Sequence, residues 1–172
     1  MPEEAGYLPL VRDARIDHVA VAVHDVASAA RLYRDVLGGE FLFGGDVLDQ
    51  GFRFVQYRFP GGGKVELVTP IGDGFVSRFL QRRGEGVHHV TYRVDDIEGQ
   101  VDRLRAGGVT LTLVNLANKH WKEAFIHPRD AHGVLIQLAQ SPHQDDETAR
   151  HMRGAFPEAV LLGERPARGP TA

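Results

Sequence analysis

The chain contains one unit twice, and this internal repeat constrains its fold more than any other feature. The run Ile16-Asp17-His18-Val19 returns as Val87-His88-His89-Val90. A strand-like run around residue 66 returns around residue 137, and in both copies 48 positions separate the early His from the late Glu or Gln. The matched residues are His18 and Glu66 in the first copy, and His89 and Gln137 in the second.

Both copies predict the order β-α-β-β-β. In the first copy, an apolar alternation over 15–23 predicts a strand, Asp25 is typical of a helix N-cap, and Gly38-Gly39 ends the helix. Strand-like runs follow at 40–43, 52–59 and 64–69. The second copy repeats this order around a helix that starts at Asp95-Asp96, with strands expected at 87–94, 110–114, 123–126 and 134–139.

These elements predict the domain organisation. We expect an N-terminal leader at 1–14, a first βαβββ module at 15–70, a linker with a short helix at 71–86, and a second βαβββ module at 87–142. Residues 143–172 are expected to form a C-terminal tail that is partly disordered, since its end is rich in Arg, Pro and Gly. The predicted fold class is α+β, with the two modules pairing into an incomplete barrel around a metal-binding cleft.

The composition excludes several classes of protein. There is no cysteine, so any metal must be held by imidazole, carboxylate, amide or water. The net charge of −3 gives no reason to expect a nucleic-acid or membrane partner. No apolar run approaches the roughly 20 residues that a membrane span needs. Because the first residues also lack the pattern of a secretory signal, we expect a cytoplasmic protein.

The four matched residues form a candidate metal site. Each lies on an expected strand, so its side chain points to one face of a sheet. A carboxylate flanked by Val65 and Leu67 is costly unless it is solvated or paired. Any one of these residues alone is better interpreted as a polar side chain with a hydrogen-bond partner. At matched positions in a repeat, they favour one divalent metal ion (Co, Zn, Ni, Mn or Fe(II)) held by His18, Glu66, His89 and Gln137.

Several of these segments also resemble a known family, the vicinal oxygen chelate superfamily of glyoxalases, bleomycin-resistance proteins and dioxygenases. The most similar group is the methylmalonyl-CoA epimerase-like proteins. The resemblance covers residues 16–140, and its motifs are Ile16–Val23, Arg31–Gly38, Lys64–Pro70, Gly84–Val90, Phe125–Pro128 and Gly133–Leu138.

The resemblance implies a metal-dependent isomerase or lyase that acts through a metal-chelated enolate, as in methylmalonyl-CoA epimerase or glyoxalase. Its substrate would be a small molecule with vicinal oxygens, including an acyl-CoA, and the protein would be a homodimer. Glu66 and Gln137 then occupy the catalytic positions. In the epimerase and glyoxalase enzymes the position of Gln137 is normally Glu, and an amide cannot act as a base. This departure moves the expected base to Glu66.

Two alternatives remain open. Two His and one carboxylate also match non-haem Fe(II) enzymes of the extradiol dioxygenase type, and a metal-free protein that binds a small ligand or confers resistance would need no chemistry at all. Further side chains that we expect to bind substrate are Gln56, Lys119, His120 and Lys122. An equally simple interpretation of residues 118–122 is a solvated loop in which Trp121 anchors the packing.

Overall fold

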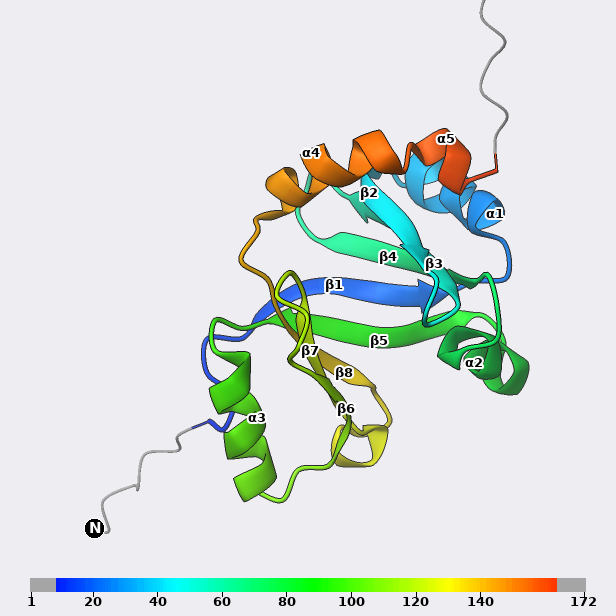
Figure 1. The fold of residues 1–172 in the computed structure, drawn as a ribbon. Helices are drawn as coiled ribbons and strands as arrows, with labels where there is room; N and C mark the ends of the chain where they lie inside the picture. The colour runs from blue at the N-terminus through cyan, green and yellow to red at the C-terminus, as the bar shows by residue number, and fades with distance from the viewer. Residues whose placement is uncertain (1–8, 164–172) are drawn as a thin grey trace, which may run out of the picture. The chain divides into compact units, whose positions relative to one another are not determined.

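The computed structural model describes residues 9–163, and the chain divides into two compact units (Figure 1). One unit contains residues 18–89 together with the segment that starts at His143, and we call it the Glu66 unit. The other contains residues up to Asp17 together with Val90–Pro142, and we call it the Gln137 unit. The unit boundary falls within two strands, β1 (Arg15–Ala22) and β5 (Gly86–Arg93).

The Glu66 unit contains the first βαβββ module. Its strands are β1, β2 (Glu40–Val47), β3 (Phe52–Arg58) and β4 (Lys64–Pro70), in the spatial order β2-β3-β4-β1. β1 runs parallel to β4, and the other two pairs are antiparallel. The crossover is α1 (Val26–Ala30), which continues as the π-helix η1 (Arg31–Val36). As predicted, Asp25 caps α1, because its Oδ1 accepts from the backbone N–H groups of Ala27 and Ser28.

The Gln137 unit repeats this topology. Its strands have the order β5-β8-β7-β6, and its elements are β5, α3 (Ile97–Ala106), β6 (Leu111–Asn115), β7 (Lys122–Ile126), η2 (Pro128–Asp130) and β8 (Ile136–Gln140). The parallel pairs match residue for residue, since Ala20 lies opposite Glu66 in β1–β4 and Thr91 opposite Gln137 in β5–β8. Asp96 caps α3 as Asp25 caps α1. The predicted α+β class is therefore confirmed.

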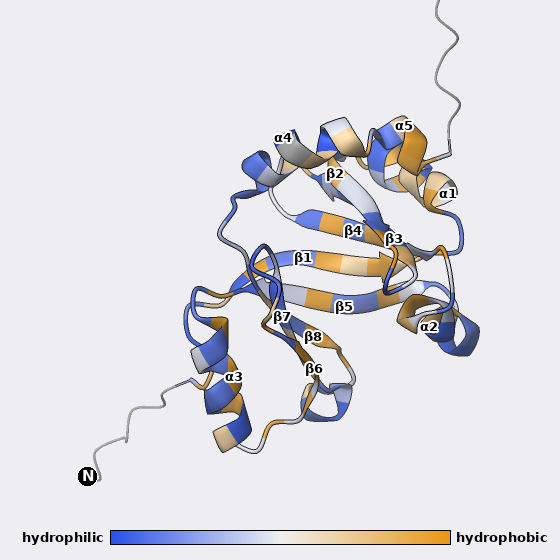
Figure 2. Ribbon diagram, viewed as in Figure 1, coloured by the Kyte–Doolittle hydropathy of each residue, from blue (hydrophilic) through white to orange (hydrophobic). Residues whose placement is uncertain are grey.

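The two faces of the Glu66 unit's sheet differ in what they bury. Side chains alternate along a strand, so the residues that flank Glu66 point away from it. Leu67 packs on that far face with Val55 and Tyr57, in a core that α1 and α5 (Glu158–Leu161) cover. On the Glu66 face, Val68 packs against α2 (Phe75–Arg83), the short helix predicted in the linker. Figure 2 shows hydrophobic stretches on β1 and β4 and on α5.

The C-terminal segment packs as part of the Glu66 unit, which differs from the tail expected from residue 143. It forms α4 (Asp145–Ala155) and α5 (Figure 1). Its Ala149 and Leu161 are buried. Ala149 packs against β2, and Leu161 packs in the core on the far face. An ion pair of 2.7 Å from Lys64 Nζ to Asp145 fixes the start of α4. The expected disorder at 165–170 lies outside the described residues.

The described part of the leader docks on α3 within the Gln137 unit. The backbone of Arg12 exchanges two hydrogen bonds of 3.1 Å with the side-chain amide of Gln100, and Arg103 donates to the carbonyl of Leu10.

Over residues 9–163, no helix has the length and apolar character that crossing a membrane requires.

The packing of α5 on β2 depends on a glycine. A Cβ on Gly44 would lie 2.5 Å from the Phe54 carbonyl oxygen and 2.6 Å from Leu161 Cδ1. We therefore predict that Gly44→Ala lowers the free energy of unfolding by about 1–3 kcal/mol, as overpacking does in other cores. Urea denaturation measures this. Gly61→Ala is the matched control, because nothing lies within 4 Å of its Cβ. Equal stability of both variants would contradict the packing described.

Candidate metal centre

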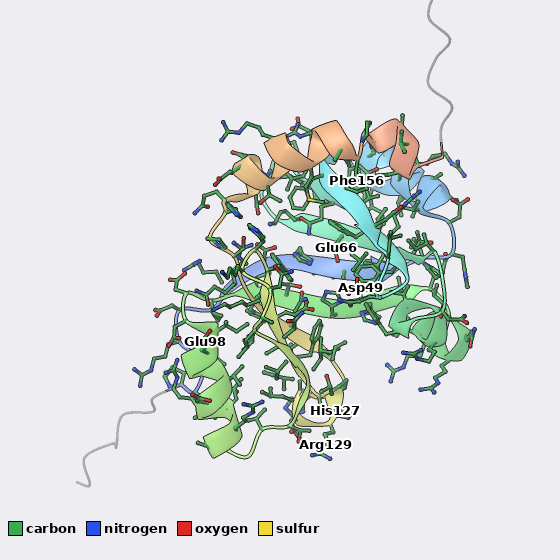
Figure 3. The ribbon with its side chains drawn as sticks, in the orientation of Figure 1. Asp49, Glu66, Glu98, His127, Arg129 and Phe156 are labelled. Carbon is green, nitrogen blue, oxygen red and sulfur yellow. The ribbon has the colours of Figure 1, made fainter. Side chains whose placement is uncertain are left out.

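Three of the four predicted ligands lie together in the Glu66 unit. His18, Glu66 and His89 each offer one ligand atom, and these three atoms lie within 4.8 Å of one another. His18 lies on β1, Glu66 on the neighbouring β4 and His89 on β5 (Glu66 is labelled in Figure 3). His18 lies two residues before Ala20, the cross-strand partner of Glu66, so the parallel pairing places both side chains on one face.

The donor set fits a divalent metal ion. His18 Nε2 and Glu66 Oε2 are 3.7 Å apart, and the His18 and His89 rings meet edge to face at 6.0 Å between centroids. All three residues are buried, at 2%, 9% and 6% exposure. Burial of a carboxylate beside two imidazoles is costly unless charges are compensated. Two imidazoles and one carboxylate are the ligands that Zn²⁺ and related ions bind, with a further position left for water or substrate.

Gln56 supports Glu66 from the neighbouring strand. It lies directly opposite Glu66 in the β3–β4 register, and its Nε2 donates a 2.8 Å hydrogen bond to Glu66 Oε2. Its Oε1 is buried and has no hydrogen-bond partner among residues 9–163. Buried acceptors of this kind are uncommon in folded proteins. Gln56 Oε1 therefore leaves an acceptor beside the three candidate ligands, which fits a site that binds a metal ion with its water or substrate.

His88 contacts His89, although strand alternation predicts that the two side chains point to opposite faces. Their Nδ1 atoms are 2.8 Å apart. The His88 ring packs against Phe75 and Phe79 of α2, with centroid separations of 5.3 and 4.9 Å. Burial against these rings lowers the pKa of His88 to about 4. His88 is therefore neutral at pH 7.

Gln137 lies in the Gln137 unit, where both ends of its amide are hydrogen-bonded. Its Oε1 accepts a 2.6 Å bond from the Thr91 hydroxyl, and its Nε2 donates a 2.7 Å bond to Glu123. Phe125 lies directly opposite Gln137, so the amide donates instead to Glu123, two residues before Phe125 on the same face of β7. Its role as a fourth ligand stays a prediction from the repeat.

Sequence reasoning missed Glu123, a second buried carboxylate. It is 8% exposed and accepts hydrogen bonds from Gln137 and from the indole Nε1 of Trp121, at 3.2 Å. Glu123 is the first residue of the strand predicted at 123–126, and apolar residues follow it. It has no matched position in the repeat, which is the feature that singled out Glu66.

Three of the residues predicted to bind substrate lie on β7 or in the loop before it. Each of them either has a partner nearby or lies at the surface. Lys122 forms a 2.6 Å ion pair with Glu98 of α3. Lys119 and His120 are exposed in a turn that Asn118 closes by accepting from the N–H of His120. Trp121 stacks under the Arg93 guanidinium at 5.3 Å. A substrate role for Lys119, His120 and Lys122 remains a prediction, as does the one for Gln56.

Comparison with known proteins defines the class to which this fold and site belong. Residues 17–125 match the Glyoxalase/Bleomycin resistance protein/Dioxygenase superfamily, and the chain belongs to this family. Among its members, the chain is similar to methylmalonyl-CoA epimerases. It is 36% identical over 131 residues to the ethylmalonyl-CoA/methylmalonyl-CoA epimerase of Cereibacter sphaeroides, which covers 73% of this chain and 97% of that protein. The human mitochondrial methylmalonyl-CoA epimerase is 34% identical over 131 residues, with 74% of each chain covered.

Solved epimerase structures share the fold. The methylmalonyl-CoA epimerase of Mycobacterium tuberculosis aligns with a TM-score of 0.69 and 33% identity, over 80% of this chain and 95% of that one. A variant of the Streptomyces coelicolor enzyme in complex with 2-nitronate-propionyl-CoA aligns with a TM-score of 0.67 and 30% identity, over 75% and 98% of the two chains. This open-sheet α+β fold is therefore that of the epimerases of the vicinal oxygen chelate superfamily.

The cluster predicts metal-dependent stability. We expect Zn²⁺ or Co²⁺ at 100 times its Kd to stabilise the wild-type protein by about 2.7 kcal/mol, since the ion binds only the folded site. Thermal unfolding with and without metal measures this. In His18→Ala the stabilisation should vanish. In His24→Ala, which removes an exposed imidazole of the same unit, it should persist. Loss of the effect in both variants, or in neither, would contradict the site.

Proposed function

We propose that the protein is a metal-dependent isomerase that moves a proton next to a carbonyl of a small substrate with vicinal oxygens, in the manner of a methylmalonyl-CoA epimerase. The observation that carries the proposal is the buried cluster of His18, Glu66 and His89 in a chain of this family. Relatives named as methylmalonyl-CoA epimerases at 34–36% identity support an acyl-CoA as the substrate class.

The three clustered residues would hold the ion, and Gln137 is the fourth ligand that the repeat predicts. When bound, a divalent ion acts as a Lewis acid that polarises the substrate carbonyl and makes the neighbouring C–H more acidic. A neutral imidazole binds a metal ion without adding charge, so Glu66 would supply the negative charge that offsets the charge of the ion. All three side chains are buried, so an ion that they hold would be partly shielded from bulk solvent.

Glu66 is the residue that we propose to carry the proton. It is the only carboxylate of the cluster. Gln56 and His18 both approach its Oε2, which leaves Oε1 as the atom that can take a proton from the substrate and return it. Gln137 is an amide and cannot share this work. With one carboxylate, removal and return of the proton on the same face gives solvent exchange, and epimerisation requires that the proton be delivered to the opposite face.

Solvent-proton exchange tests this function. The protein loaded with Co²⁺ should incorporate deuterium from D₂O into methylmalonyl-CoA, as measured by mass spectrometry. Glu66→Gln should slow this exchange at least 100-fold, because it removes the base and leaves an amide of the same shape. Gln137→Glu should not restore the rate of the Glu66→Gln protein if Glu66 is the base.

The controls separate function from folding. His24→Ala should exchange at the wild-type rate. Absence of exchange with every divalent ion tested would overturn the proposal, and so would an undiminished rate in Glu66→Gln.

The same donor set also occurs in non-haem Fe(II) oxygenases, so oxygen uptake with catechol is the discriminating assay. We expect no uptake above that of the His18→Ala variant. Uptake that requires Fe(II) and an intact His18 would replace the isomerase with a dioxygenase.

A further inference from the structure

We propose that Arg58 and Lys64 form a binding site for an anionic group of the substrate, and that helix α4 fills this site with carboxylates of its own until the substrate replaces them. The identity of the substrate rests on the proposed function. The two cations and their partners on α4 all belong to the Glu66 unit. The ligand group is a carboxylate or a phosphate, and a malonyl-CoA derivative carries both.

The two cations lie next to the candidate metal centre on the same face of the sheet. Arg58 of β3 and Lys64 of β4 are direct cross-strand partners. Gln56 and Glu66 are the next such pair on this face, two residues away on each strand. Residues two apart on a strand share a face and are separated by about 7 Å. A substrate that reaches Glu66 with one polar group can therefore reach the cations with another.

This pair of cations needs an anion beside it. Like charges directly opposite one another on a sheet repel. The Lys64 side chain is also 9% exposed, and a buried cation is costly without a negative partner. Helix α4 supplies that partner, since Lys64 Nζ lies 2.7 Å from a carboxylate oxygen of Asp145. The Arg58 guanidinium lies 2.9 Å from Asp146 and 3.5 Å from Asp145.

Helix α4 lies over the Glu66 face, where it can close the site. Its Ala149 packs in one cluster with Phe43, and Phe43 is the residue of β2 directly opposite Gln56. Cross-strand partners share a face, so this packing sets α4 on the side of the candidate metal centre. The helix begins at Asp145, beyond the residues 17–125 that match the family, so the closure is a feature that the family match does not cover.

Gln56 gives a second, independent indication of a ligand on this face. The residue is 4% exposed, and its Oε1 has no hydrogen-bond partner among residues 9–163. A glutamine that served only the packing of the protein would be expected to use both ends of its amide. The acceptor stands one cross-strand pair away from the two cations, and a ligand held by them can bring a donor to it.

Competition between α4 and the substrate predicts opposite effects on KM. With Co²⁺ bound, Lys64→Met should raise the KM for methylmalonyl-CoA about 10-fold or more, because it removes a charge-assisted contact. Asp145→Asn should lower this KM, because it weakens the internal competitor. An ion pair that only holds the helix in place would not lower KM when it is broken. Asp49→Asn, the same substitution at an exposed position of the same unit, should leave KM unchanged.

Hydrogen–deuterium exchange of α4 gives a readout that needs no turnover. Malonate, which has carboxylates, and coenzyme A, which has phosphates, are added separately to the full-length, metal-free protein. At least one of them should speed amide exchange in α4 of the wild type, and the one that does so identifies the anionic group. Neither should do so in Lys64→Met. Arg58→Gln, at a more exposed cation, is the second variant and should weaken the same effect if Lys64→Met does not fold.

The outcomes separate this proposal from the proposed function. If an anion speeds exchange in α4 of the wild type but the protein has no isomerase activity, the proposed function fails and the anion site stands. If neither anion changes exchange in α4, or if Asp145→Asn raises KM, the helix is only a structural support and the anion site is overturned.

Discussion

The parallel pairing of β1 with β4 is the constraint on which the candidate site depends. It sets Ala20 opposite Glu66, so that His18, two residues earlier on the same face, comes within 3.7 Å of the carboxylate. A slip of one residue would turn Glu66 into the core that Leu67 now fills, and it would turn Leu67 towards the imidazoles. Register is fixed by burial on both faces, since Leu67 is fully buried and Val68 nearly so. The hydrophobic core of the Glu66 unit therefore also fixes the geometry of its polar cluster.

Much of this arrangement can be predicted from the sequence, because the repeat gives each module an independent check. Residue types at matched positions are enough to predict the strands and the N-caps at Asp25 and Asp96. They also predict the cluster of His18, Glu66 and His89. The repeat gives no information on α4 and α5, because both helices lie outside the two modules. The many charged residues of α4 indicate a solvated segment. In the structure, α4 instead pairs with Lys64 and packs against β2. His88 was missed because strand alternation describes backbone direction and not where a ring can turn.

The two modules differ in the surroundings of their later matched residues, Glu66 and Gln137. In the Glu66 unit, a Gln on β3 supports a Glu on β4. In the Gln137 unit, a Glu on β7 accepts from a Gln on β8. Each unit thus holds one buried pair of carboxylate and amide, with the two roles exchanged between the strands. This exchange explains why Gln137 breaks the equivalence in sequence while each unit keeps a buried carboxylate.

The central claim is that His18, Glu66 and His89 bind one metal ion. The most direct test is anomalous diffraction at the cobalt edge from crystals grown with Co²⁺. We predict a single strong anomalous peak within bonding distance of one ring nitrogen of His18, one ring nitrogen of His89 and a carboxylate oxygen of Glu66. A peak located elsewhere, or no peak, would contradict this assignment.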